Sequence, residues 1–158
     1  MLLQELENIC KLTSGKQHEY FQKMFEDARV VNCKKMSEIL PKHILECVNF
    51  IDIKTGECYR NSTLISQLSK DIHYVEGRME FLGISIDHAF NEYKGNYFDA
   101  TLEIALHEIP GKDDEYLCIG VYCFDDVINT INNTDGFYGG IWSKKYHYKD
   151  KLKIHKVI

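Results

Sequence analysis

The stretch "IHYVEGRMEFLGISIDHAF", from Ile72 to Phe90, decides the fold class of this chain. It is rich in β-branched and aromatic residues, and its apolar positions recur with a period near two. Successive side chains of a strand point to opposite faces, so this alternation is typical of a strand with one buried face. Glycines punctuate the runs. We therefore predict that this stretch forms strands of a mostly antiparallel sheet.

Similar runs follow along the chain. "NYFDATLEIAL" from Asn96 and "EYLCIGVYCF" from Glu115 have the same composition, and we predict that each is a strand. "DDVINTINN" predicts a short helix, and "IWSKKYHYKDKLKIHKVI" from Ile141 alternates well enough for a last strand or two. The interval 115–158 is therefore expected to supply the C-terminal strands.

The chain before the sheet has helical periodicity. "LLQELENICKL", "HEYFQKMFEDARVV" and "SEILPKHILECVNFI" place apolar residues three and four apart, so 1–50 is predicted to be a helical N-terminal portion. After the turn "DIKTG", the run "CYRNSTLISQLSK" predicts a further helix. The expected architecture is a single α+β domain over 1–158, with N-terminal helices and a cysteine-bearing helix packed on a mostly antiparallel β-sheet.

Composition limits the functional classes. The chain has 158 residues, 44% of them hydrophobic and 27% charged, which is typical of one globular domain. A net charge of −5 gives no electrostatic basis for binding nucleic acid. No apolar run approaches the ~20 residues of a membrane span. The start, "MLLQELENICKL", carries acidic residues where a signal peptide has positive charge, so we expect a cytoplasmic protein that does not bind membranes.

Six cysteines are scattered through the chain, and no CxxC pair occurs. Cys118 and Cys123 are five apart in a predicted strand, so their side chains are expected on opposite faces, which argues against a shared metal ion. A cytosolic chain of this size does not need disulfides. Five of the six are therefore interpreted as small buried hydrophobic residues, and no metal or other cofactor is expected. The sixth, Cys58, has a different setting.

Cys58 lies in "GECYRNSTL", where a turn ending at Gly56 leads into the predicted helix. A helix N-terminus favours the thiolate over the thiol, because unpaired backbone N–H groups and the helix dipole stabilise negative charge there. The thiolate is the reactive form. Cys58 is therefore a candidate nucleophile, although a buried cysteine in a first helical turn would show the same pattern.

A histidine and an aspartate follow at suitable positions. In "ISIDHAFN", His88 shares a strand face with apolar residues and needs a polar partner there. If "YKGN" closes a two-residue hairpin with Lys94 and Gly95 at its tip, His88 faces Thr101. His88 and Asp99 then become diagonal neighbours on one face. An imidazole held by a carboxylate can activate a thiol and later protonate a leaving group.

These segments resemble a known superfamily. "CYRNS…YVEGRM…ISIDHAFN…GNYFDATL" is similar to the Cys–His–Asp core of the papain-like cysteine enzymes, including their transglutaminase-like and NlpC/P60-like branches, and looks like small bacterial and phage proteins of this class. The resemblance covers 56–101, the expected catalytic core. It implies a cysteine at the start of a helix packed on an antiparallel sheet, with the histidine and aspartate on the following strands.

Carried over by residue, the resemblance implies that Cys58 is the nucleophile, His88 the general base and acid, and Asp99 the group that orients the imidazole. The N–H of Cys58 would supply part of an oxyanion hole. Papain adds a glutamine upstream of its cysteine. Here no glutamine lies in the adjacent loop, and Asn49 or Asn61 are the substitutes that the sequence offers.

The sequence therefore predicts a cysteine-nucleophile hydrolase or acyl-transferase of the peptidase, amidase, deamidase or transglutaminase type. It would act without a cofactor on an amide, isopeptide or thioester carbonyl, and its expected partner is a protein or peptide substrate. The alternative is a catalytically degenerate binding or interaction module on the same fold. The triad is shared by many activities, so neither the substrate nor the oligomeric state follows from it.

Overall fold

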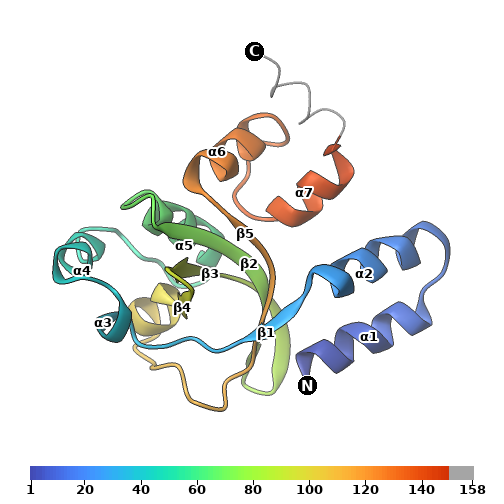
Figure 1. The fold of residues 1–158 in the computed structure, drawn as a ribbon, viewed down its shortest axis with the longest axis horizontal. Coiled ribbons are helices and arrows are strands. Elements are labelled where there is room, and N and C mark those ends of the chain that lie inside the picture. Colours follow the sequence, from blue (N-terminus) through green and yellow to red (C-terminus); the bar gives the residue numbers. More distant parts are fainter. Residues whose placement is uncertain (150–158) are drawn as a thin grey trace.

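The computed structural model describes residues 1–149 and has the predicted α+β architecture, with helices packed around a curled antiparallel sheet (Figure 1). The five strands are β1 (Arg29–Val31), β2 (Ile72–Phe81), β3 (Ile84–Tyr93), β4 (Asn96–Phe98) and β5 (Tyr116–Tyr122). The helices are α1 (Leu2–Leu12), α2 (Gly15–Asp27), α3 (Met36–Ile39), α4 (Lys42–Val48), α5 (Cys58–Ser66), α6 (Phe124–Asn132) and α7 (Ile141–His147), with one π-helix, η1 (Thr101–Ala105).

The sheet has the order β1-β5-β2-β3-β4, and every pair of neighbouring strands is antiparallel. It curls far enough that its two edges approach one another. Cys33, just beyond β1, forms an isolated parallel bridge with Tyr97 of β4, and the Lys34 N–H donates a hydrogen bond to the Tyr97 carbonyl at 2.8 Å. The sheet is therefore nearly closed and has an interior of its own.

Both faces of the central strands are buried, and alternate residues fill two different cores. Val75, Phe90 and Tyr116 point into the curled sheet. Tyr74 and Ala89, each one position away, instead pack with Val127, Ile131 and Ile141 of α6 and α7. Because side chains alternate along a strand, the period of two predicted from the sequence places each set on its own face.

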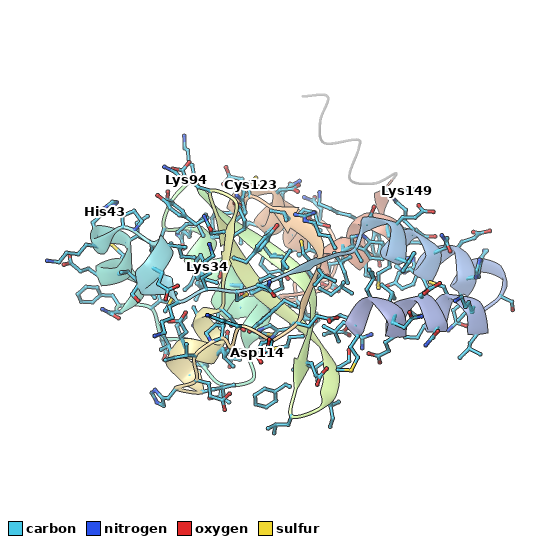
Figure 2. The ribbon with its side chains drawn as sticks, turned by 60° about the horizontal axis from the view of Figure 1, so that its bottom comes forward. Lys34, His43, Lys94, Asp114, Cys123 and Lys149 are labelled. Carbon is cyan, nitrogen blue, oxygen red and sulfur yellow. The ribbon has the colours of Figure 1, made fainter. Side chains whose placement is uncertain are left out.

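The helices cover the ends of the molecule. Leu2 and Leu6 of α1 recur four apart and pack on Leu117 of β5, so the α1–α2 hairpin lies at one end. The short helices α3 and α4 form the opposite end, where Figure 2 labels His43 of α4. In the described part of the chain, no helix is both long and apolar enough to cross a membrane.

Several element predictions are wrong in detail. Residues 1–50 are not entirely helical, because Arg29–Val31 adds a strand to the edge of the sheet beside β5. The predicted helix "SEILPKHILECVNFI" is also interrupted at Pro41 and forms two helices. Leu40 and Pro41 separate α3 from α4, as expected for a residue that lacks a backbone N–H.

The C-terminal strand prediction is also wrong where it can be examined. Within 115–158, only β5 is a strand among the described residues, and Ile141–His147 is the helix α7. The carboxylate of Glu76 accepts hydrogen bonds from the N–H groups of Ile141 and Trp142 at 2.8 and 3.2 Å, which stabilises the start of this helix. Residues 150–158 lie outside the described residues.

Candidate active site

Cys58 is the first residue of α5, as the sequence predicts. Gly56 precedes it with φ of +77°, a left-handed conformation that glycine adopts without steric cost and that turns the chain into the helix. The first backbone N–H groups of any α-helix have no acceptor within the helix. Cys58 is partly exposed, so a reagent can reach it, and as the first residue of α5 it lies at the end of the helix where these donors are unpaired.

His88 lies in β3, and only 5% of its surface is exposed. Its ring is 6.3 Å from the ring of Tyr116 and 6.4 Å from that of Phe90, measured between centroids. Its Nε2 donates to Oδ2 of Asp99 at 2.7 Å. Since Nε2 is occupied in this way, Nδ1 is the ring nitrogen that remains for the thiol of Cys58.

Asp99 is fully buried and is held by three hydrogen bonds. Besides His88, the hydroxyl of Tyr116 donates to Oδ2 at 3.0 Å, and the backbone N–H of Leu102 donates to Oδ1 at 3.0 Å. A buried carboxylate needs such partners, because desolvating it without them is strongly unfavourable. Asp99 therefore has a fixed orientation and holds the imidazole of His88 in turn.

The charge on His88 follows from these contacts. Burial of the ring lowers its pKa, but the charge and hydrogen bond of Asp99, together with the nearby Cys58 side chain, raise the pKa of His88 to about 10. At neutral pH the ring is then an imidazolium. A cationic imidazole next to a cysteine stabilises the thiolate, which is the nucleophilic form.

The three predicted residues line one cavity of about 370 Å³. The hairpin register between His88 and Asp99 is confirmed at its tip, where Tyr93 pairs with Asn96. It is wrong further along. The strand β4 ends at Phe98, so Asp99 follows the strand, and Thr101 begins η1 instead of pairing with His88. The structure nevertheless brings His88 and Asp99 together, as expected.

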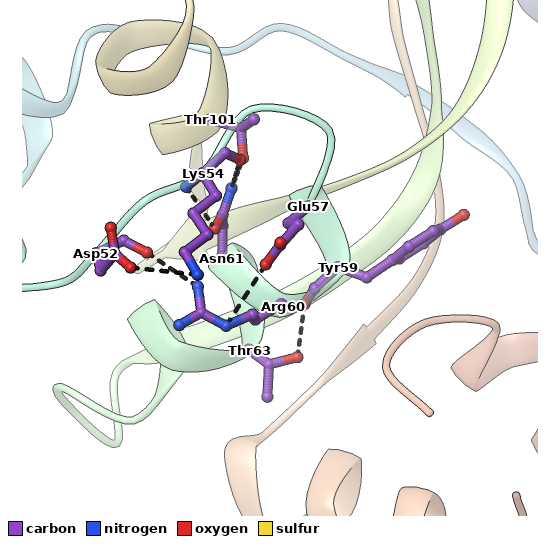
Figure 3. A network of polar contacts seen from close by, with 8 residues as sticks. All are labelled: Asp52, Lys54, Glu57, Tyr59, Arg60, Asn61, Thr63 and Thr101. Carbon is purple, nitrogen blue, oxygen red and sulfur yellow. Dashed lines mark hydrogen bonds and ion pairs between the residues drawn. The ribbon is translucent and has the colours of Figure 1, made fainter. Parts of the chain in front are cut away.

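Neither asparagine suggested as an oxyanion donor is available at the cavity. The Asn61 side chain is fully buried and donates to the Lys54 carbonyl at 2.7 Å and to the Thr101 hydroxyl at 3.1 Å, while its Oδ1 accepts from the Lys54 N–H (Figure 3). These bonds use the whole amide to tie the loop before α5 to η1. Asn49 is exposed and is not among the residues that line the cavity.

Two further side chains stabilise the structure around the site: Glu76 of β2 and Tyr116 of β5. Glu76 has a structural role, because its carboxylate bonds to the start of α7 and accepts from the Tyr74 hydroxyl at 2.6 Å. Tyr116 was missed. A tyrosine in a strand is an ordinary core residue, and only the tertiary contact shows that its hydroxyl reaches Asp99.

The cysteine prediction is partly wrong. All six cysteines are free thiols, but Cys47 and Cys123 are exposed, whereas only Cys10, Cys33 and Cys118 are buried. Cys47 lies in α4, and Cys123, which Figure 2 labels, immediately precedes α6. Because both are exposed, neither contributes to a core. Among the described residues no group of three or more histidine, cysteine or acidic side chains is placed to hold a metal ion.

Comparison of the chain with protein-family models, with curated proteins and with solved structures yields no match. The geometry of Cys58, His88 and Asp99 is therefore the feature from which a function can be proposed.

Proposed function

We propose that the protein is a cysteine-nucleophile hydrolase or acyl-transferase that acts through Cys58, His88 and Asp99, in the manner of the papain-like enzymes that its sequence resembles. One observation carries the proposal. A buried His88 is bonded to Asp99 through Nε2 at 2.7 Å and interacts with the Cys58 side chain at the edge of a cavity. This order of side chains supports the proposal, because acyl transfer requires a nucleophile, a base beside it and a group that orients the base.

The reaction proceeds in two steps. The Cys58 thiolate attacks the substrate carbonyl, a C–S bond forms, and the bond from carbon to the leaving nitrogen, oxygen or sulfur breaks while His88 gives that atom a proton. Water then attacks the acyl group and passes a proton to His88, and the C–S bond breaks to release the acid. An amine in place of water makes the second step a transfer. The backbone N–H of Cys58 would stabilise the oxyanion.

Two features support a cytoplasmic setting and a protein or peptide substrate. Six unpaired thiols suit a reducing compartment such as the cytoplasm. A net charge of −5 favours a protein or peptide substrate over nucleic acid.

Two reagents test the proposal, iodoacetamide and a short acyl thioester, with peptide mass mapping of each cysteine. We expect Cys58 to react with iodoacetamide faster than Cys47 and Cys123, although both of these are more exposed. We also expect the thioester to leave an acyl group on Cys58. Replacing His88 with Gln should lower acylation by about a hundredfold or more, because general acid–base catalysis contributes on that scale.

His73→Gln is the matched control. His73 also bonds a carboxylate, that of Glu92 at 2.6 Å, but it does not line the cavity. This variant should acylate at the wild-type rate. If Cys58 reacts no faster than Cys123 and no acyl-Cys58 forms, the enzyme proposal is wrong and the degenerate binding module is favoured.

A further inference from the structure

The cavity beside Cys58 has walls that are mostly apolar. Its volume of about 370 Å³ lies within the range of small-molecule sites, roughly 300–1,000 Å³. Two elements supply the apolar side chains: the β2–β3 hairpin and the region of η1. These side chains are Met79, Phe81, Ile86, Leu102 and Leu106. An apolar group of a ligand that enters the cavity therefore leaves water immediately next to the Cys58 side chain.

Each charged group of the cavity already has a partner of opposite charge. Among its lining residues, all of which lie in the described part of the chain, the charged side chains are Asp87, His88 and Asp99. His88 and Asp99 bond to one another, and Asp87 pairs with Arg78, whose Nε is 3.3 Å from its carboxylate. No lysine or arginine lines the cavity to meet a carboxylate or phosphate. An anionic group placed there would lose its hydration without gaining a partner, which is unfavourable.

The apolar surface continues from the cavity onto the hairpin. Ile86, at the cavity, is 37% exposed, whereas Ile84 is 65% exposed and lies outside the lining. The two isoleucines are two residues apart on one strand and share a face. The cavity thus opens to solvent beside Ile86, so a chain attached to the reacting carbonyl can enter it from the surface.

We infer that the cavity receives the acyl chain of the substrate and that this chain is apolar and uncharged. The inference rests on the proposed function and names its substrate class: acyl compounds whose group next to the carbonyl is an aliphatic or aromatic chain of several carbons. Each methylene buried contributes about a fourfold gain in binding, so chain length should affect acylation strongly.

The first test uses N-methyl-, N-propyl- and N-hexylmaleimide and does not require catalysis. Each reagent alkylates the exposed Cys123 as well as Cys58, so the ratio of the two rates in one molecule removes intrinsic differences between reagents. We expect this ratio to rise at least about tenfold from the methyl to the hexyl reagent. A ratio that does not change with chain length overturns the inference.

A pair of variants places the chain in the cavity. Ile86→Asp puts a charge at the cavity and should abolish the preference for the hexyl reagent, whereas Ile84→Asp, two residues earlier on the same face, should keep it. Both side chains are already more than one third exposed, so we expect both variants to fold. Equal loss of the preference in both variants would overturn the assignment to this cavity.

The second test measures acyl-Cys58 formation from acetyl, butyryl and hexanoyl thioesters of one thiol, with glutaryl thioester as the charged analogue. We expect the rate to rise with chain length. We also expect the glutaryl compound to react more slowly than the uncharged thioesters of similar size. Acylation at equal rates throughout overturns the inference and leaves the proposed function intact. Length-dependent alkylation with no acyl-Cys58 from any thioester overturns the proposed function and the acyl assignment with it.

Discussion

His88 is a charged ring in a buried position, and its environment determines its charge. The groups that face it are the Asp99 carboxylate, the Tyr116 hydroxyl beside that carboxylate, and the Cys58 thiol. Burial raises the pKa of Tyr116, so its hydroxyl keeps its proton and remains a hydrogen-bond donor to Asp99. The cation on His88 therefore pairs with an oriented carboxylate on one side and lies beside the Cys58 side chain on the other.

The raised pKa of His88 predicts a dependence of stability on pH. The pKa rises from its ordinary 6.5 to about 10 in the folded protein, so the folded state binds the proton more tightly. The resulting stabilisation is fully present below pH 6.5 and is lost as the pH rises through 10. Urea denaturation across this interval should show a steeper fall in the free energy of unfolding for the wild type than for His88→Gln.

Cys58→Ser is the control for this pH profile. Asp99 contributes more than Cys58 to the raised pKa of His88, so most of the slope should persist when the thiol is replaced. The tyrosines and the other five cysteines are common to all three proteins and cancel in the comparison. Parallel profiles for the wild type and His88→Gln would contradict the assigned charge.

At the scale of elements, the β2–β3 hairpin positions His88. The neighbouring strand β5 restricts which residue β2 can have at position 77. Gly77 of β2 pairs with His88, and the register between β2 and β5 shifts between Glu76 and Gly77. A Cβ at Gly77 would lie 1.7 Å from the backbone carbonyl oxygen of Leu117. The strands are therefore packed more closely here than any other residue allows.

Gly77→Ala should accordingly lower the free energy of unfolding by about 3 kcal/mol or more, because the backbones of β2 and β5 must move apart to make room for the methyl group. Gly111→Ala is the matched control. There the nearest atom is the Asp114 carboxylate at 3.1 Å, a side chain that can move, so the change should be within about 1 kcal/mol. Chemical denaturation measures both, and equal stability of the two variants would show that the close approach at Gly77 is absent.

The local prediction of elements succeeded where the pattern itself determines the element. The alternation over Ile72–Phe81 and Ile84–Tyr93 gave both strands, and the turn at Gly56 gave the helix start at Cys58. The prediction of strands after Ile141 failed because alternation there is weak and the decisive contacts come from elsewhere. Glu76, far away in sequence, accepts the first N–H groups of α7, and Ile141 packs on Tyr74.

At the scale of the whole molecule, the α1–α2 hairpin is attached to the sheet on the side of β5. Leu6 is fully buried against Leu117, and the indole N–H of Trp142 in α7 donates to Asp27 at 2.8 Å. The hairpin thereby joins the sheet to the C-terminal helix (Figure 1). It contributes no residue to the cavity beside Cys58, so its role there is support.

Leu6→Ala should therefore lower the free energy of unfolding by about 2–5 kcal/mol, as expected for a cavity in a packed core. Leu12→Ala, in the same helix but 87% exposed, should change it by no more than about 0.5 kcal/mol. Urea denaturation measures both. A similar cost at the two positions would show that α1 does not pack on the sheet as described.

The sequence by itself determined the features that depend on residues close together in the chain. These are the helical and strand periodicities, the turn before Cys58, and the hairpin tip that brings His88 toward Asp99. Only the tertiary structure decided that Asp99 bonds to His88 from beyond the end of β4, that Tyr116 holds Asp99, that Asn61 is used in the framework, and that apolar side chains line a cavity beside the thiol. The physical reason is that periodicity and turn chemistry are local, whereas partners for a buried charge come from whichever distant elements pack against it.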